Sequence, residues 1–329
     1  MGFNCGIVGL PNVGKSTLFN ALTETAAAEA ANYPFCTIEP NTGRVAVPDP
    51  RLDALASLAG SATVIPTQLE FVDIAGLVRG ASKGEGLGNQ FLANIRETDA
   101  IAHVLRCFDD SEITHVDGSV DPLRDAGTVE TELMLADIES LERRMAALVK
   151  KTRGGDAEAK RDLALMEKLF AGLSEGVPAR RAEGLSADET RRLPQLQLLS
   201  AKPVLYVCNV AEGDAADGND HTAAVAAYAE QEGAAHVVVS AAIEAEITQL
   251  DSEDKAEFLS ELGLQEAGLA RLIRAGYGLL DLLTFFTAGP KEARAWTVAA
   301  GSSAPEAAGV IHTDFQRGFI RAETISYDD

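Results

Sequence analysis

The chain has 329 residues, of which 46% are apolar, so it is long enough and apolar enough for more than one packed core. Its formal net charge of −22 excludes a generally basic surface of the kind that binds nucleic-acid phosphates. The N-terminus carries neither a signal peptide nor a myristoylation pattern, and the longest nearly apolar run is about half of the roughly 20 residues that a membrane helix needs. We therefore expect a globular, cytoplasmic protein with no membrane contact and no sequence-specific DNA binding.

Strand-like runs alternate with helical patterns along most of the chain. The runs are Phe3–Val8, Arg44–Val47, Gln68–Val72, Ala100–Phe108, Pro203–Cys208 and His236–Val239. This alternation predicts an α/β fold with a mainly parallel sheet that helices cover on both faces. The expected nucleotide-binding domain comprises residues 1–132 and 200–278.

Residues 133–199 differ because apolar side chains recur there at helical spacing among many charges, and no strand intervenes. We expect an inserted helical hairpin or coiled-coil arm that turns at Gly154-Gly155. Between Arg143 and Arg192 the chain holds 12 Lys/Arg and 8 Asp/Glu, which leaves two interpretations open: a solvated helical face or an RNA-facing patch. Residues 279–329 change character again, and their alternating aromatic and β-branched residues predict a small separate module that contains strands.

The segment Gly9-Leu-Pro-Asn-Val-Gly-Lys15-Ser16 follows an apolar strand and opens a helix, which is the context of a phosphate-binding loop. Glycine lets backbone N–H groups surround a β-phosphate, and the helix N-terminus favours the negative charge. Lys15 is predicted to bridge the β- and γ-phosphates as a catalytic residue, and Ser16 to ligate Mg²⁺. The predicted phosphate contacts are Asn12, Val13, Gly14, Lys15, Ser16 and Thr17.

A second metal-binding element is predicted at Asp73, which ends a strand in Leu69-Glu-Phe-Val-Asp-Ile-Ala-Gly76. Asp73 can hold the magnesium shell through water, and the N–H of Gly76 can bind the γ-phosphate. Thr37 is the natural second hydroxyl on Mg²⁺, from a switch segment. The glycine-rich stretch around Lys83 is either a second switch or a disordered surface loop.

Activation of the attacking water is the least determined step, because Leu77 stands where Ras-like enzymes carry a glutamine. Two candidates remain: His115, in the polar loop after Phe108, and a monovalent cation such as K⁺ held near Asn12. A lone histidine in a loop is more often an ordinary surface residue.

Base recognition departs from the guanine-reading Asn-Lys-x-Asp pattern. The corresponding run is Asn209-Val210-Ala211-Glu212, so the lysine is lost and the acid is one methylene longer. In the guanine-reading pattern, the aspartate carboxylate selects guanine because it accepts two hydrogen bonds from that base. A carboxylate in a different position removes the basis for GTP preference. We therefore expect ATP to be preferred. The run Ser240-Ala241-Ala242, after the last strand, is expected to place a backbone N–H against the base edge.

Together these motifs closely resemble the YchF-type, Obg-like ATPases of the TRAFAC-class P-loop NTPases. The resemblance covers nearly the whole chain and implies a GTPase-like domain with a coiled-coil insertion and a C-terminal, β-grasp-like TGS module. It implies slow ATP hydrolysis, nucleotide-dependent association with ribosomes, and a catalytic role for His115. Family members usually continue beyond the equivalent of Asp329, so the TGS module is expected to be incomplete.

The resulting hypothesis is a molecular switch in which ATP·Mg²⁺ orders the Thr37 and Gly76–Gln90 segments and hydrolysis releases them. One alternative is a nucleotide-gated regulator that binds protein targets and hydrolyses ATP only incidentally. A small-molecule phosphotransferase is a further alternative, since a P-loop also serves such kinases.

Overall fold

The computed structural model describes residues 3–30, 42–74 and 87–329. Nine strands lie in these ranges: β1 (Asn4–Val8), β2 (Thr42–Ala46), β3 (Thr63–Ile65), β4 (Gln68–Asp73), β5 (Ala100–Arg106), β6 (Val204–Asn209), β7 (Ala235–Val239), β8 (Leu282–Ala288) and β9 (Glu292–Ala299). The helices are α1 (Lys15–Ala30), α2 (Pro50–Ala59), α3 (Leu87–Glu97), α4 (Pro122–Thr152), α5 (Ala157–Ser174), α6 (Ala187–Arg192), α7 (Asp220–Glu232), α8 (Ala241–Ile247), α9 (Ser252–Glu261), α10 (Gly268–Leu279), α11 (Ala304–Ile311) and α12 (Thr313–Arg317). Thr37 and Gly76, and most of the two predicted switch segments, lie outside the described residues.

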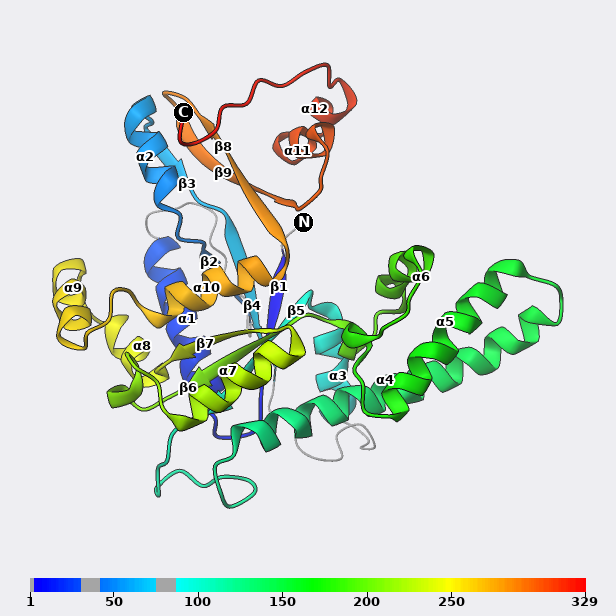
Figure 1. Cartoon of the computed structure of the whole chain (residues 1–329). Coiled ribbons are helices and arrows are strands. Elements are labelled where there is room, and N and C mark those ends of the chain that lie inside the picture. The colour runs from blue at the N-terminus through cyan, green and yellow to red at the C-terminus, as the bar shows by residue number, and fades with distance from the viewer. Residues whose placement is uncertain (1–2, 31–41, 75–86) are drawn as a thin grey trace.

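The main sheet has six strands in the order β2-β4-β1-β5-β6-β7. β2 runs antiparallel to β4, and the other neighbours are parallel, as the alternation of strands and helices predicts. Figure 1 shows α1 and α10 on one face of this sheet, with α7 and the start of α4 on the other. β5 and β6 are buried along their whole length, since helices cover both of their faces.

Because β1, β4, β5, β6 and β7 are parallel, their carboxyl ends meet at one edge of the sheet. The chain leaves β1 in one direction to β4 and later returns past it to β5, so the strand order reverses beside β1. Ligands of open α/β sheets bind at this reversal point. The fold therefore brings the segments that follow these five strands into one place.

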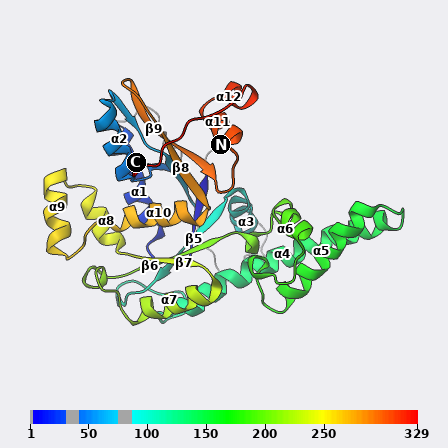
Figure 2. The ribbon, with the colours of Figure 1, turned by 45° about the horizontal axis from the view of Figure 1, so that its top comes forward.

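The helical insertion forms an arm, α4 and α5, that projects from the sheet (Figures 1 and 2). α4 has 31 residues and begins at Pro122, with Asp121 as its N-cap. Its first turns pack against the nucleotide-binding sheet, and the rest of the helix belongs to the arm. The arm has its own apolar core, in which Leu141, Leu165 and Leu169 are among the buried residues. Gly155, with a φ of 86°, lies in the turn between the two helices, where the sequence predicts it.

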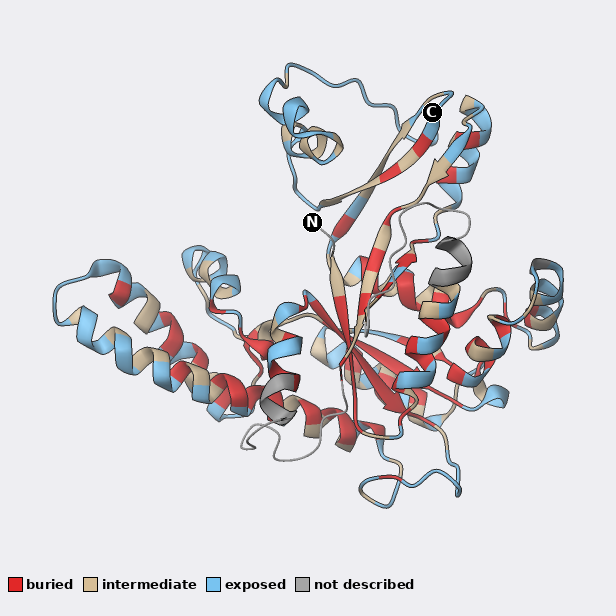
Figure 3. Ribbon diagram, turned by 180° about the vertical axis from the view of Figure 1, so that it is seen from behind, coloured by how far each residue is buried: buried red, intermediate tan, exposed pale blue. Residues whose placement is uncertain are grey.

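A second sheet, in the order β3-β9-β8, lies at the C-terminal end of the chain. β3 comes from residues 63–65, which sequence analysis assigned to the nucleotide-binding domain, and it pairs in parallel with β9. α2 packs on this sheet through Leu52 and Ala56. No residue from Gly301 onward is buried (Figure 3), and the TGS architecture remains a prediction.

Candidate nucleotide site

The phosphate-binding loop between β1 and α1 requires glycine at two positions. A Cβ on Gly9 would meet the carbonyl oxygen of Val104 at 2.5 Å, and a Cβ on Gly14 would meet Nδ2 of Asn209 at 2.2 Å. Gly14 also has a φ of 93°, which L side chains rarely adopt. The loop can therefore lie close to β5 and β6 only because these two side chains are absent.

Lys15, at the end of this loop, and Asp73, the last residue of β4, place opposite charges near each other. Lys15 is buried, and its Nζ donates a hydrogen bond of 2.6 Å to the carbonyl of Leu10. Burial lowers the pKa of Lys15 to about 8, and the negative charge of Asp73 opposes that shift. Burial likewise raises the pKa of the Asp73 carboxyl, which the charge of Lys15 partly offsets. A further opposite charge would stabilise the charged form of each group: a phosphate for Lys15 and a metal ion for Asp73.

Asn209, at the end of β6, braces the loop from the side. Its Nδ2 donates to the carbonyl of Val13 at 2.9 Å, and its Oδ1 accepts from the N–H of Ala241 at 2.9 Å. Asn209 is only 4% exposed. The side chain thus ties the phosphate-binding loop to the start of α8, and the N–H of Ala241 is already used. The N–H of Ala241 is therefore not free for the backbone contact to a base that is expected from Ser240-Ala241-Ala242.

A pocket of about 770 Å³ opens beside the phosphate-binding loop. It is lined by Asn12, Gly14, Thr17, Phe108, Asp109, Asp110, Ile113, Asn209, Val210, Ala211, Glu212, Gly213, Ala241 and Ala242. The pocket brings Asn209, Val210, Glu212, Ala241 and Ala242 beside Asn12, Gly14 and Thr17 of the phosphate loop, whereas Ser240 is buried and does not line it. Four further lining residues were not predicted, although their position shortly after β5 places them at the same edge: Phe108, Asp109, Asp110 and Ile113.

Val210 and Glu212 differ in exposure. Val210 is 3% exposed, so its side chain belongs to the core, whereas Glu212 is exposed and begins a short 3-10 helix. Ser16 and Thr17 are exposed in the first turn of α1, where hydroxyl groups can reach a ligand. His103, on β5, is buried, and burial lowers its pKa to about 3.

His115 does not line the pocket. Its side chain is 4% exposed, and both ring nitrogens are engaged: Nδ1 accepts from the N–H of Asp117 at 3.1 Å, and Nε2 lies 2.8 Å from Oδ2 of Asp125. With Nδ1 accepting, Nε2 is the nitrogen that can donate to Asp125. The predicted catalytic histidine is therefore held here against the first turn of α4, through Asp125.

The loop that carries His115 also contacts the phosphate loop directly. Nδ2 of Asn12 donates a hydrogen bond of 3.1 Å to the carbonyl of Thr114. Asn12 has a φ of 61°, a left-handed conformation that asparagine tolerates better than most residues. This contact links the phosphate site to the residue that precedes His115.

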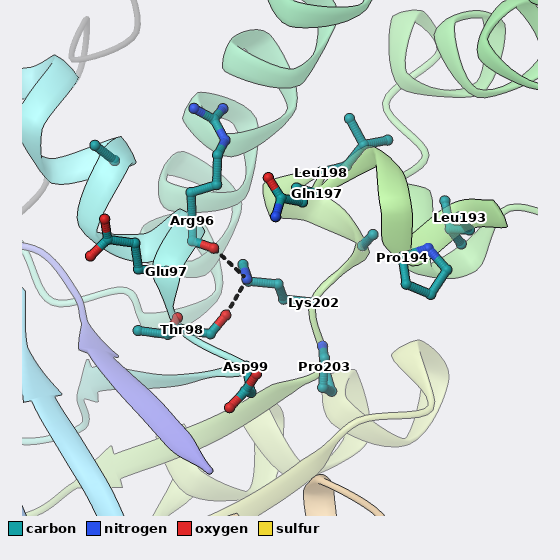
Figure 4. Close-up of a pocket in the computed structure, with 12 residues that line it drawn as sticks. Arg96, Glu97, Thr98, Asp99, Leu193, Pro194, Gln197, Leu198, Lys202 and Pro203 are labelled. Atoms are coloured by element: carbon teal, nitrogen blue, oxygen red, sulfur yellow. Dashed lines mark hydrogen bonds between the residues drawn. The ribbon is translucent and has the colours of Figure 1, made fainter. Parts of the chain in front are cut away.

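A second cavity, of about 700 Å³, lies between the end of α3 and the base of the arm (Figure 4). There Lys202 donates through Nζ to the carbonyls of Arg96, at 3.2 Å, and of Thr98. Burial lowers the pKa of Lys202. Nearby, the carboxylate of Asp137 on α4 accepts from the N–H groups of Leu199 and Ser200. The end of α3 and the arm are therefore joined through residues 199–202.

The sheet order, the phosphate-binding loop after β1 and the pocket beside β6 define a P-loop protein with a GTPase-like α/β fold. A family model described as a 50S ribosome-binding GTPase matches residues 4–138, and the YchF C-terminal model, described as a protein of unknown function, matches residues 282–329. The chain is 60% identical over 329 residues to a protein of Haemophilus influenzae named ribosome-binding ATPase YchF, covering all of this chain and 90% of that relative. Bacillus subtilis has a protein of the same name, 53% identical over 331 residues, with the same coverage of both chains. The chain belongs to the YchF family.

A solved structure, that of the Schizosaccharomyces pombe YchF GTPase, matches with a TM-score of 0.86 and 40% identity, over 97% of this chain and 86% of that one. A GTP-binding protein from Pyrococcus horikoshii OT3 shares the fold, with a TM-score of 0.58 and 20% identity over 97% of this chain and 92% of that one. Within the described residues, no helix combines the length and the apolar character that crossing a membrane requires.

Proposed function

We propose that this protein is an ATP-binding and ATP-hydrolysing switch that associates with ribosomes in a nucleotide-dependent way. The observation that carries the proposal is the pocket that Asn12, Gly14 and Thr17 of the phosphate-binding loop line together with Val210 and Glu212, which stand in place of lysine and aspartate. The names of the relatives differ, since some are called ATPases and one a GTPase, so the choice of base rests on the pocket itself.

The chemistry of the base site favours ATP over GTP. A guanine reader aligns a short carboxylate with two donors of the base, and a lysine supports that arrangement. Here the acid is longer, and the position of the lysine is taken by a buried valine. Guanine therefore loses its two paired hydrogen bonds, while adenine, which lacks those donors, loses nothing.

Magnesium fits the polar groups around the phosphate loop. Ser16 is exposed at the start of α1, and Asp73 is a partly buried carboxylate whose pKa is raised by burial, so a bound cation would stabilise its charged form. With Thr37 they would form the magnesium shell, and Mg²⁺ would neutralise the triphosphate during hydrolysis. For a potassium ion, the side-chain oxygen of Asn12 would be the ligand, because its nitrogen donates to Thr114.

In the proposed catalytic arrangement, Lys15 and the N–H of Gly76 stabilise the γ-phosphate, and His115 positions water. His115 must first leave Asp125 and Asp117, because both of its ring nitrogens are engaged. This requirement agrees with hydrolysis that is slow until a partner moves the loop.

Coupling to the arm has two routes through the described residues. One runs from Asn12 through Thr114 and His115 to Asp125 on α4. The other runs from α3, which follows the predicted second switch, through Lys202 to the base of the arm. We infer that the arm, residues 133–199, changes its position when the nucleotide changes.

The arm also carries an excess of positive charge, which favours binding to the phosphates of ribosomal RNA. Residues 143–161, its distal part, hold seven Lys/Arg and two Asp/Glu, whereas the whole chain has a net charge of −22. They are Arg143, Arg144, Lys150, Lys151, Arg153, Lys160 and Arg161, of which all but Arg144 are exposed. Ribosomal RNA presents phosphates, so the acidic body favours an approach with the tip of the arm first.

Two measurements test the proposal. Competitive calorimetry should give a lower dissociation constant for ATP than for GTP, and a clear GTP preference would overturn the assigned substrate. Co-sedimentation with ribosomes in ATP, ADP and no nucleotide should give different bound fractions. Equal fractions in all three conditions would remove the switch, and no ribosome binding in any of them would favour a protein target.

A further inference from the structure

Arg106, the last residue of β5, is a fully buried arginine whose hydrogen bonds within the described residues all go to carbonyl groups. It is 1% exposed. Its Nε donates to the carbonyl of Phe108 at 3.1 Å, Nη1 to that of Ile113 at 2.9 Å and Nη2 to that of Asp110 at 3.0 Å. The guanidinium carbon also lies 4.7 Å from the centre of the Phe108 ring. Within the described part of the chain, no carboxylate lies within ion-pair distance of Arg106.

A buried charge without a carboxylate partner is unfavourable by several kcal/mol unless hydrogen bonds offset the lost hydration. Here the partial charges of three carbonyls from one short loop provide that compensation. Three donors in a rigid plane determine the positions of three acceptors, because the guanidinium cannot bend to follow them. The arrangement therefore holds the loop after β5 in one conformation.

The three residues that accept from Arg106 are all lining residues of the nucleotide pocket. Phe108, Asp110 and Ile113 form, with Asp109, the wall on the β5 side, next to the β6 side that Val210 and Glu212 provide. Arg106 itself does not line the pocket. It lies behind the wall, so it acts on a ligand only through the loop that it holds.

We infer that Arg106 is a positioning residue that preforms the base-facing wall of the nucleotide pocket. A loop that is ordered before the ligand arrives loses no conformational entropy on binding, so affinity for the base is higher. The inference rests on the proposed function, since it assumes that the pocket beside the phosphate loop holds the base of a nucleotide. The phosphates would bind to the loop after β1, and the hydrogen bonds of Arg106 go to the wall loop instead. The two loops are thus separate segments, joined by the bond from Asn12 to the carbonyl of Thr114.

This separation makes a sharp test, because the two halves of the ligand can be offered separately. Binding of ATP, ADP and inorganic tripolyphosphate is measured by calorimetry on the full chain. R106M should lower the affinity for ATP and ADP by about tenfold, the loss expected when a wall loop must order on binding, and change that for tripolyphosphate by less than about twofold. R106K keeps the charge but not the planar fork, and should show a smaller loss in the same direction.

Arg180 supplies a matched control for the loss of a buried arginine. Its side chain is 12% exposed, and it pairs with Glu130 and, at 3.1 Å, with Glu232, none of which lines the nucleotide pocket. R180M should lower the unfolding temperature yet leave the ratio of ATP to tripolyphosphate affinity as in the wild type. If Arg106 only stabilised the fold, R106M and R180M would both keep the wild-type ratio of ATP to tripolyphosphate affinity.

The outcome that overturns the inference is a wild-type affinity ratio in both R106M and R106K. Should R106M fail to fold, R106K decides, and an unchanged ratio in it overturns the inference. Failure of the proposed function gives a different result, seen in the wild type: ATP would then bind no more tightly than tripolyphosphate. If GTP proved to be the tighter ligand, the same ratio would be measured with GTP, and the role of Arg106 would still be tested.

Discussion

The ring of His115 donates a hydrogen bond of 2.8 Å from Nε2 to the carboxylate of Asp125, in the first turn of the helix that becomes the arm. Asp125 is 1% exposed, so the bond forms away from water. A hydrogen bond to a buried charged group contributes about 1.5–3 kcal/mol, enough to keep the histidine in this position most of the time. The bond therefore opposes the movement that catalysis by His115 would need.

Removing this bond should release His115 and speed basal hydrolysis. We expect D125A to raise basal ATP turnover by about tenfold, the factor that corresponds to ~1.4 kcal/mol, and to lower the unfolding temperature. Phosphate release on single and double variants with H115A provides the measurement. D121A is the control, because Asp121 caps α4 without touching His115. A D125A rate that does not depend on His115 would refute the catalytic assignment.

In mildly alkaline solution, Lys15 should take up a proton when a nucleotide binds. Its pKa is about 8 in the free protein, below the ordinary value of 10.5, and a phosphate would raise it. ATP affinity should therefore weaken as pH rises above about 8, since deprotonated Lys15 must first gain a proton. Titrations in buffers of different ionisation enthalpy count that proton. K15R, which stays charged, should bind ATP without the pH dependence; an equal pH dependence in K15R would contradict the assignment to Lys15.

Restoring the guanine-reading pattern should restore guanine binding. E212D should improve GTP affinity relative to ATP by about tenfold, because the shorter carboxylate can meet both guanine donors. V210K should add to this effect but lower stability by about 1–3 kcal/mol, since Val210 is 3% exposed and a lysine must leave the core. Calorimetry with both nucleotides measures the ratio, and an unchanged ratio in the double variant argues against Glu212 as a base reader.

Gly14 should be irreplaceable for a steric reason. A Cβ there would lie 2.2 Å from Nδ2 of Asn209, at a φ of 93°. G14A should therefore displace Asn209 and weaken ATP binding by more than about a hundredfold. Gly60 is the matched control: its φ is 61°, but nothing lies within 4 Å of the point that a Cβ would occupy, so G60A should lose only about 1 kcal/mol of stability and bind ATP normally. Equal ATP affinity in the two variants would contradict the steric argument.

Charge at the tip of the arm should govern ribosome association. The triple variant K150Q/K151Q/R153Q should lower the fraction that co-sediments with ribosomes and reduce the slope of binding against salt concentration, by about 0.7–0.9 for each phosphate that is no longer neutralised. ATP hydrolysis without ribosomes should be unchanged. R317Q/R321Q, with exposed arginines at the C-terminal end, serves as the control. Ribosome binding that is equal in both variants would place the interface elsewhere.

Much of the fold could be predicted from local pattern. Each of the six strand-like runs overlaps a strand of the main sheet, and the helical period of residues 133–199 corresponds to the arm, because side-chain periodicity reflects which face is buried. β3 escaped prediction, since only three residues pair and their partner, β9, lies more than 200 residues away. α4 begins at Pro122, earlier than the expected arm, because its first turns pack on the sheet.

The sequence by itself determined which chemical groups are available at the candidate site: Lys15 and Ser16 in the loop after β1, the acid at Asp73, and the run Asn209–Glu212, which is predicted to read the base. Such motifs are legible because residue type and spacing are local properties. Only the tertiary structure decided which polar groups are already engaged. Asn209 braces a loop 196 residues away, His115 is held by Asp125, and Arg106 shapes a wall that it does not line. Each polar group can make only a few hydrogen bonds, at distances of about 3 Å. Whether a group is available to a ligand therefore depends on the partners that folding brings next to it.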